Sequence, residues 1–232
     1  MLILAIESSA KAASVCLWRD GDIIAQASQR CALTHSRTLL PMAENLFRNT
    51  EIPKEELDAV AVAQGPGSFT GIRIGIATAK GLCWGLDKPA IGVSTLEAMA
   101  HMADFLSEEY VICPCMDARR AQVYNALFEV KDGTVHRLTA DRAIAMDEVA
   151  AELRALERPV WILGDGWQLA ADALRDSGLR VAVAPEMLRW QSACGVAMAA
   201  AHAEPQPAED LLPVYLRISQ AERDWQAREN IK

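Results

Sequence analysis

Residues Leu57–Leu86 read LDAVAVAQGPGSFTGIRIGIATAKGLCWGL, an order of residue types that predicts a strand, a glycine-rich turn and a helix. The opening apolar run, Leu57–Ala63, is typical of a buried strand, and Ile72–Leu86 is dense in Ala, Ile and Gly, which favours a helix. Glycines ease the tight turn, and Ser68 or Thr70 can cap the first free N–H groups of the helix. A helix start of this kind can hold an anion, but no Lys follows in the phosphate-loop pattern. The stretch therefore predicts a capped strand–turn–helix unit rather than a Walker site.

The same order of elements occurs twice on either side of this unit. Each half opens with three predicted strands, and an Asp-Gly hairpin turn joins the second strand to the third. The predicted strands are Leu2–Ile6, Ala13–Trp18 and Ile23–Ala27 in the first half, and Tyr110–Met116, Gln122–Val130 and Val135–Leu138 in the second. An acidic residue, Glu7 or Asp117, follows the first strand of each triplet.

Helices and strands alternate after each triplet. The predicted helices are 36–48, 72–86, 95–103, 147–156, 167–176 and 191–201, and the further strands are 57–63, 89–93, 160–163 and 180–184. Three antiparallel strands followed by βα units, occurring twice, indicate an α/β, duplicated ribonuclease-H-like fold, which is the architecture of the actin, Hsp70 and sugar-kinase (ASKHA) superfamily. We therefore expect two mixed-sheet domains, residues 1–104 and 105–232, with Leu211–Ile218 laid back on the body.

The composition limits the classes of protein to consider. The 232 residues are 51% hydrophobic, which is enough to form a full hydrophobic core. The net charge of −8 argues against binding nucleic acid through a broad positively charged surface. Six cysteines without a C-x-x-C pair favour a reducing compartment. The N-terminal apolar run is too short for a signal peptide, and no segment approaches the ~20 apolar residues of a membrane span. We expect a soluble, cytosolic protein that does not bind a membrane.

Motifs for enzyme chemistry are weak. ATPases of this superfamily hold phosphate in the hairpin after the first strand, but Glu7–Lys11 and Asp117–Arg120 both lack the glycine that lets backbone approach a phosphate. Gly164–Gly166 suits either a nucleotide-base turn or an ordinary strand exit. The four histidines form no i, i+3 or i, i+4 pair, so a helical metal site is not expected. Ser68 lies in a GPGSF sequence without a triad around it. An independent ATPase or carbohydrate kinase, and a peptidase, remain as alternatives, which calorimetry with Mg-ATP and a casein assay would test.

The two helices nearest the N-terminus carry more apolar surface than packing on one sheet requires. In the helix Ile72–Leu86, Gly71, Gly75 and Ala79 form a ridge of small residues at four-residue spacing, on which another helix can pack closely. The preceding helix, Ser36–Arg48, is also broadly apolar. The two helices can simply pack on each other and on the sheet, but surplus apolar surface on an acidic protein favours a partner-binding face.

The candidate interface combines helix-packing side chains with the residues that shape the entry of the second helix. Its members are His35, Ser36, Leu39, Leu40, Ala43, Phe47, Gly67, Ser68, Phe69, Thr70, Gly71, Ile72, Arg73, Gly75, Ile76, Ala79 and Cys83. Blocking close approach with Ala79→Arg is expected to abolish assembly without unfolding the chain. Gel filtration with the partner would test this expectation.

Several of these motifs together resemble one known family. ILAIESS at 3–9, HS at 35–36 with LLP at 39–41, GPGSFTGIRIG at 65–75 with AKGL at 79–82, DARR at 117–120, and PVYLR at 213–217 before AE at 221–222 are similar to the TsaB (YeaZ) family. The resemblance covers almost the whole chain. One departure is Glu7, because family members often have Asp at this position.

The resemblance implies an actin-like fold and a part in making N6-threonylcarbamoyladenosine beside the anticodon of tRNAs that read ANN codons. It implies a non-catalytic scaffold without a cofactor, paired through its first two helices with a catalytic paralogue, TsaD, and joined by an ATPase, TsaE. It further implies a homodimer when the chain is alone, contact with tRNA only through the complex, and room for a nucleotide at the junction with TsaD.

Overall fold

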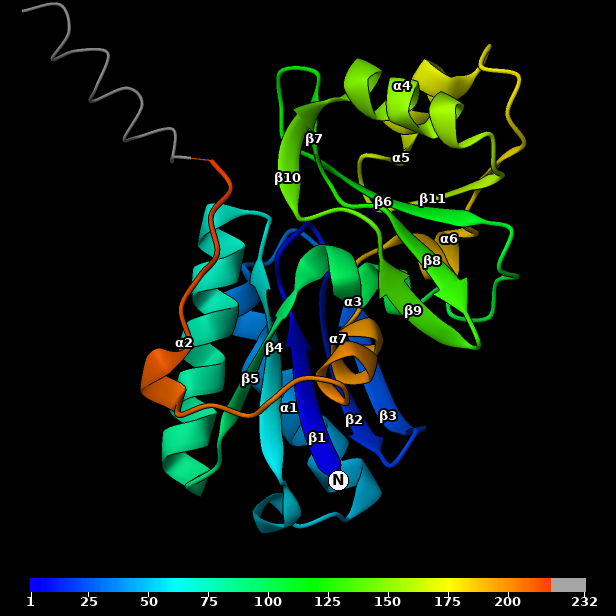
Figure 1. The fold of residues 1–232 in the computed structure, drawn as a ribbon. Helices are drawn as coiled ribbons and strands as arrows, with labels where there is room; N and C mark the ends of the chain where they lie inside the picture. Colours follow the sequence, from blue (N-terminus) through cyan, green and yellow to red (C-terminus); the bar gives the residue numbers. More distant parts are fainter. Residues whose placement is uncertain (218–232) are drawn as a thin grey trace, which may run out of the picture.

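The first half of the chain forms a five-stranded sheet (Figure 1). The computed structural model describes residues 1–217. The sheet is built from β1 (Leu2–Glu7), β2 (Ala13–Arg19), β3 (Asp22–Gln29), β4 (Ala59–Gly65) and β5 (Ala90–Ser94), in the order β3-β2-β1-β4-β5. β1, β4 and β5 are parallel, and the two hairpin pairs are antiparallel.

The second half repeats this plan. β6 (Val111–Asp117), β7 (Gln122–Asn125), β10 (Arg142–Ala145), β11 (Val160–Leu163) and β12 (Val181–Val183) lie in the order β10-β7-β6-β11-β12. β6, β11 and β12 are parallel, as are their counterparts in the first sheet. β8 (Phe128–Lys131) pairs with both β6 and β9 (Thr134–Arg137). The matching order and direction of strands confirm the duplicated ribonuclease-H-like fold.

One predicted strand, Gln122–Val130, is divided into β7 and β8. Both parts pair with β6, in one continuous register that joins Cys115 to Asn125 and Ile112 to Phe128. Between these pairs lies Pro114, which has no N–H to donate to the ladder, and its carbonyl oxygen accepts from the Asn125 side chain at 2.9 Å. The proline therefore interrupts the pairing, and the sequence interpretation was wrong in joining the two strands. It also missed β10.

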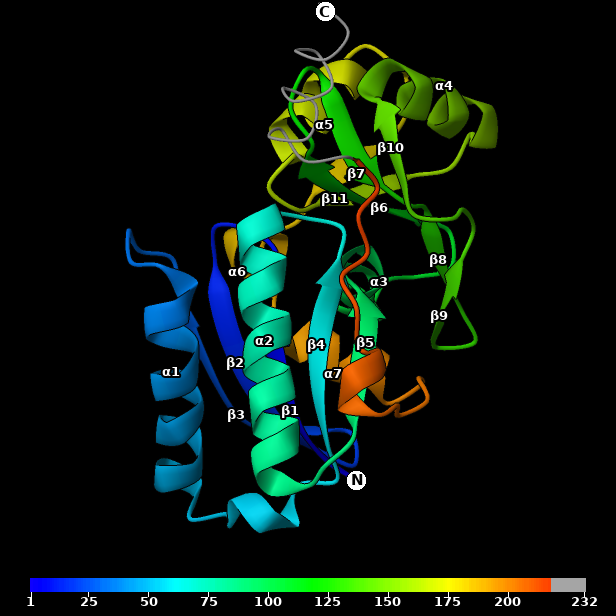
Figure 2. The same ribbon diagram turned by 90° about the vertical axis from the view of Figure 1, so that its left-hand side faces the viewer.

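Helices cover both faces of the first sheet (Figures 1 and 2). α1 (His35–Thr50) and α2 (Phe69–Leu86) lie side by side on one face, while α3 (Thr95–His101) and α7 (Ala193–Ala200) lie on the other. α7 comes from the part of the chain that the sequence assigned to residues 105–232. It crosses back because the apolar face that carries Ile3 and Ala5 needs cover that the first half does not supply.

The remaining helices belong to the second half. α4 (Met146–Leu156) and α5 (Trp167–Leu174) cover one face of its sheet, and the other face packs on α3, which lies between the two sheets. The short helix α6 (Glu186–Arg189) was not predicted, and single 3-10 turns occur at Lys54–Glu56 and Ala208–Asp210. No helix within residues 1–217 has the length and apolar character to cross a bilayer.

Candidate protein interface

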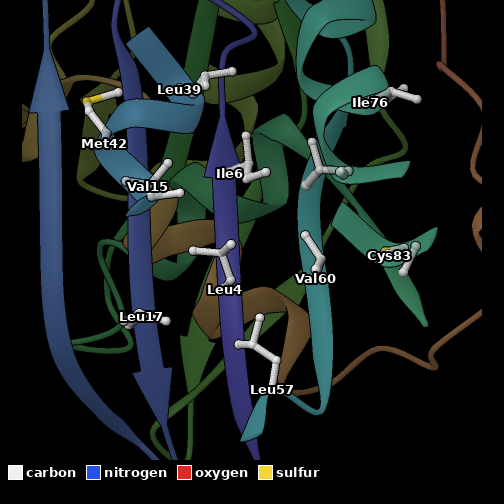
Figure 3. Close-up of a cluster of buried hydrophobic side chains, with 14 of the residues drawn as sticks. Leu4, Ile6, Val15, Leu17, Leu39, Met42, Leu57, Val60, Ile76 and Cys83 are labelled. Atoms are coloured by element: carbon white, nitrogen blue, oxygen red, sulfur yellow. The ribbon is translucent and has the colours of Figure 1, made fainter. Parts of the chain in front are cut away.

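Most of the predicted packing residues lie in the core of the chain itself. Leu39, Ile76 and Cys83 belong to the same buried cluster as Leu4, Ile6 and Val60 of the first sheet, and Figure 3 draws these side chains together. The full set that is buried in this way is Leu39, Ala43, Phe47, Ile72, Ile76, Ala79 and Cys83. These side chains already have their partners within the chain, so the prediction that they form a docking surface was wrong.

The ridge of small residues on α2 also faces inward. A Cβ atom at Gly71 would overlap the carbonyl oxygen of Ser8, and one at Gly75 would overlap the Ser8 hydroxyl. These glycines let α2 approach the end of β1 closely, and Ser8 Oγ donates to the Gly71 carbonyl at 2.9 Å. Since Ala79 is fully buried on the same side, Ala79→Arg would place a charge in the core and unfold the chain.

The opposite side of α2 is the surface that the chain leaves uncovered. Ala77, Gly81 and Gly85 follow each other at four-residue spacing and are exposed. A Cβ atom at Gly81 or Gly85 would meet nothing within 4 Å. Beside them the Trp84 side chain is 65% exposed. We call Ala77, Gly81, Trp84 and Gly85 the outer stripe.

On α1, the neighbouring helix, Leu40 is the predicted apolar residue that does reach solvent, with 44% of its surface exposed. Ser36 is exposed as well, and His35 is half-buried with Nε2 at 2.8 Å from the carbonyl oxygen of Ala10. The accessible part of the predicted interface on this helix is therefore small.

The entry of α2 forms as the sequence indicates. Ser68 is the N-cap, and its hydroxyl accepts from the Gly71 N–H at 3.3 Å, which confirms one of the two predicted caps. Thr70 is exposed in the first turn. Gly67 packs directly on Ser9, where a side chain would clash with the Ser9 backbone. The motif glycines thus serve contacts within the chain.

A C-terminal strap, residues 211–217, runs along α2 toward the second half (Figure 2). The Phe69 and Tyr215 rings stack with centroids 4.0 Å apart, and Arg73 lies over the Phe69 ring while its Nε donates to the Tyr215 hydroxyl at 2.8 Å. Arg217 donates to the Ala118 carbonyl. Two segments about 140 residues apart, both noted for their family resemblance, therefore meet at the start of α2. Ile218 of the expected terminal segment lies outside the described residues.

Glu7 at the end of β1 is withdrawn from solvent. The residue is fully buried, and this burial raises the pKa of its carboxyl to about 7. Oε1 accepts from the Ser9 N–H at 2.5 Å, whereas Oε2 has no hydrogen-bond partner among the described residues. No group of three or more His, Cys, Asp or Glu side chains within residues 1–217 is arranged to hold a metal ion.

This buried acid predicts a specific pH dependence. Folding raises the Glu7 pKa from 4.5 to about 7, so the folded state holds the proton more tightly and loses stability as pH rises through this window. Glu7→Gln keeps the oxygen that accepts from Ser9 and removes the ionisation. Relative to the parent, the variant should be more stable at pH 8 than at pH 5 by up to about 3 kcal/mol. Urea unfolding of both proteins at the two pH values measures this difference, and an equal pH dependence would contradict it.

The fold and the outer stripe define a two-domain protein of the actin-like superfamily with an uncovered helical face. The model of the family "TsaD: tRNA N6-adenosine threonylcarbamoyltransferase" matches residues 26–216. The tRNA threonylcarbamoyladenosine biosynthesis protein TsaB of Bacillus subtilis is 31% identical over 97% of this chain and 98% of its own length. TsaB of Escherichia coli is 34% identical over 94% of this chain and 95% of its own length. YeaZ from Pseudomonas aeruginosa, a solved structure, superposes with a TM-score of 0.75 at 27% identity, covering 93% of this chain and 99% of that one.

The chain belongs to the TsaB (YeaZ) family, as its motifs indicated.

Proposed function

We propose that this chain is a non-catalytic subunit of the machinery that makes N6-threonylcarbamoyladenosine in tRNAs reading ANN codons, and that it works in the cytoplasm. It docks on TsaD through the outer faces of α1 and α2 and holds TsaD in an active arrangement, while TsaE joins the complex. Alone, the chain pairs with itself through the same face. It meets tRNA only through the complex.

The outer stripe carries this proposal. A glycine inside a helix costs about 1 kcal/mol relative to alanine, and α2 has two exposed ones, Gly81 and Gly85, whose missing side chains serve no contact in the chain. A helix from another molecule can use the flat surface that they leave, and Trp84 offers a large apolar contact beside it. The relatives that match over almost their whole length are named for tRNA threonylcarbamoyladenosine biosynthesis, which supports a role in that pathway. The match to the TsaD family model supports a partner of related fold.

The non-catalytic role is supported by the state of Glu7. In ATPases of this superfamily an acidic residue at the end of the first strand positions Mg²⁺, and Glu7 occupies that place in this chain. It is instead fully buried, with a pKa raised to about 7, so at neutral pH a large share of the carboxyl is protonated. A protonated, enclosed carboxyl is a poor ligand for a hard cation.

Reconstitution tests the proposed role. Purified chain, TsaD and TsaE are combined with unmodified tRNA, ATP and a threonylcarbamoyl donor, and each protein is left out in turn. We expect modified tRNA only when this chain and TsaD are both present, and no ATP hydrolysis by the chain alone. Equal transfer by TsaD and TsaE without the chain, or ATP turnover by the chain by itself, would contradict the proposal.

A further inference from the structure

A small pocket lies on the side of the first sheet that carries α3 and α7, opposite to the face covered by α1 and α2. Trp18, near the end of β2, forms one wall, so the pocket is at the opposite end of this strand from the turn that follows β1. Both Asp-Gly hairpin turns reach it, through Gly21 and Gly133. Its volume of about 220 Å³ is below the roughly 300–1,000 Å³ of drug-sized sites, so it fits only a small ligand.

Two helices end at this pocket. A Cβ atom at Gly195 of α7 would overlap the carbonyl oxygen of Ala98 in α3, so the glycine lets the two helices lie close together (Figure 1). His101 is the last residue of α3, and His202 follows the end of α7 by two residues. Their rings lie nearly parallel with centroids 5.5 Å apart, and both line the pocket. The C-terminal end of a helix carries partial negative charge, which favours a positively charged ligand.

His101 brings a buried polar group without a partner to the pocket. Its side chain is on a residue that is 7% exposed, and neither ring nitrogen forms a hydrogen bond with another residue of 1–217. Burial lowers the pKa of His101 to about 4, so the imidazole is neutral at pH 7 and one of its nitrogens is an acceptor. A buried polar group without a partner is unfavourable, so a ligand N–H that reaches this nitrogen would remove a cost.

Asp104 places a carboxylate in the same pocket without a counter-charge. It forms no ion pair within the described part of the chain, and no Lys or Arg of that part lines the pocket. Partial burial raises the pKa of Asp104, because the carboxylate loses hydration and gains no positive neighbour in return. A positively charged ligand would supply the missing partner.

The other walls decide which kind of cation fits. A hard metal ion takes several oxygen ligands, but Asp104 and Thr134 are the only described lining residues with a side-chain oxygen. No group of three or more His, Cys, Asp or Glu side chains within residues 1–217 is arranged for a metal ion. Trp18, Val135 and Met198 give the pocket apolar walls, and an indole ring attracts a cation to its face. An organic cation with a short apolar chain matches both kinds of wall.

We propose that this pocket binds a small primary alkylammonium ion. Its ammonium group has three N–H donors, for which the Asp104 carboxylate, the His101 imidazole and the Thr134 hydroxyl are acceptors. Its alkyl chain packs on the apolar walls. Because the outer stripe is on α2, on the opposite face of the sheet, this binding is independent of the proposed docking on TsaD.

The test is a ¹H–¹⁵N NMR titration of the full chain with n-butylammonium, with n-butanol as a neutral control of similar size. We expect saturable shifts of the Gly21 and Gly133 amides and of the Trp18 indole N–H with n-butylammonium. The alcohol should bind at least about tenfold more weakly, because it lacks the charge that pairs with Asp104.

A matched pair of variants isolates the carboxylate. Asp104→Asn keeps the shape of the side chain and should weaken n-butylammonium binding about tenfold or more. Asp132→Asn removes the same charge from the turn beside Gly133, outside the pocket lining, and asparagine tolerates the φ of 51° at this position. This control should retain the parent affinity. Thermal unfolding of both variants confirms that a lost affinity is not a lost fold.

Several results would overturn the proposal. Equal affinities for n-butylammonium and n-butanol would indicate an apolar pocket without charge recognition. Equal weakening by Asp104→Asn and Asp132→Asn would indicate diffuse attraction to an acidic surface. Saturation of the two histidine rings by Zn²⁺, without competition from n-butylammonium, would assign the pocket to a metal ion. In the parent chain, shifts that are absent, or that lie only outside the pocket, would contradict the proposal without recourse to any variant.

Discussion

Gly81→Arg is expected to separate this chain from TsaD completely in gel filtration. The position lies in the middle of the outer stripe, where a helix that packs against α2 needs a flat surface. An arginine there would hold the two helices apart and would bury a charge if the complex formed. The variant should be at least as stable as the parent, because arginine favours a helix over glycine by up to about 1 kcal/mol, and no atom lies within 4 Å of the Cβ position at Gly81.

A matched control comes from the other half of the molecule. Ala155 is an exposed position on α4, so Ala155→Arg adds the same side chain to a helix surface that is not part of the outer stripe. This variant should elute with TsaD as the parent does. Co-elution of Gly81→Arg with TsaD would show that the partner docks elsewhere, and loss of the complex in both variants would point to a general effect of charge.

The second large effect concerns glycines on the two sides of α2. Gly71→Ala should destabilise the chain by about 3 kcal/mol or more, because its Cβ would overlap the Ser8 backbone oxygen and neither the helix nor β1 can move aside cheaply. Gly81→Ala makes the same chemical change in the same helix. It should instead stabilise the free chain by about 1 kcal/mol, since its Cβ enters open space.

Urea unfolding of the two variants beside the parent measures both effects. Opposite signs are the expected result. If both substitutions stabilised the chain, α2 would not rest closely on the end of β1. If both destabilised it, the side of α2 that carries Gly81 would be covered by the chain's own residues.

Much of the fold follows from local patterns. Apolar strands alternate with helices in both halves, and each of these elements is predicted by residues that are near each other in the chain. The sequence by itself therefore determines the duplicated fold and the N-cap of α2. Element limits were mostly close: β11 was predicted as Val160–Leu163 and lies there. The division of Gln122–Val130 into two strands depends on Pro114, which lies in β6, the strand that pairs with both parts. The sequence of Gln122–Val130 alone does not contain this information.

The orientation of α2 was decided only by the tertiary structure. The helix carries two ridges of small residues at four-residue spacing, one through Gly71, Gly75 and Ala79 and one through Ala77, Gly81 and Gly85. An amphipathic helix shows which side faces the core by its polar residues, but this one is apolar on both sides. The sequence therefore established that α2 has a surplus apolar face and named the wrong one. The contact with Ser8, 63 residues away from Gly71, turns the first ridge inward and leaves the second to solvent.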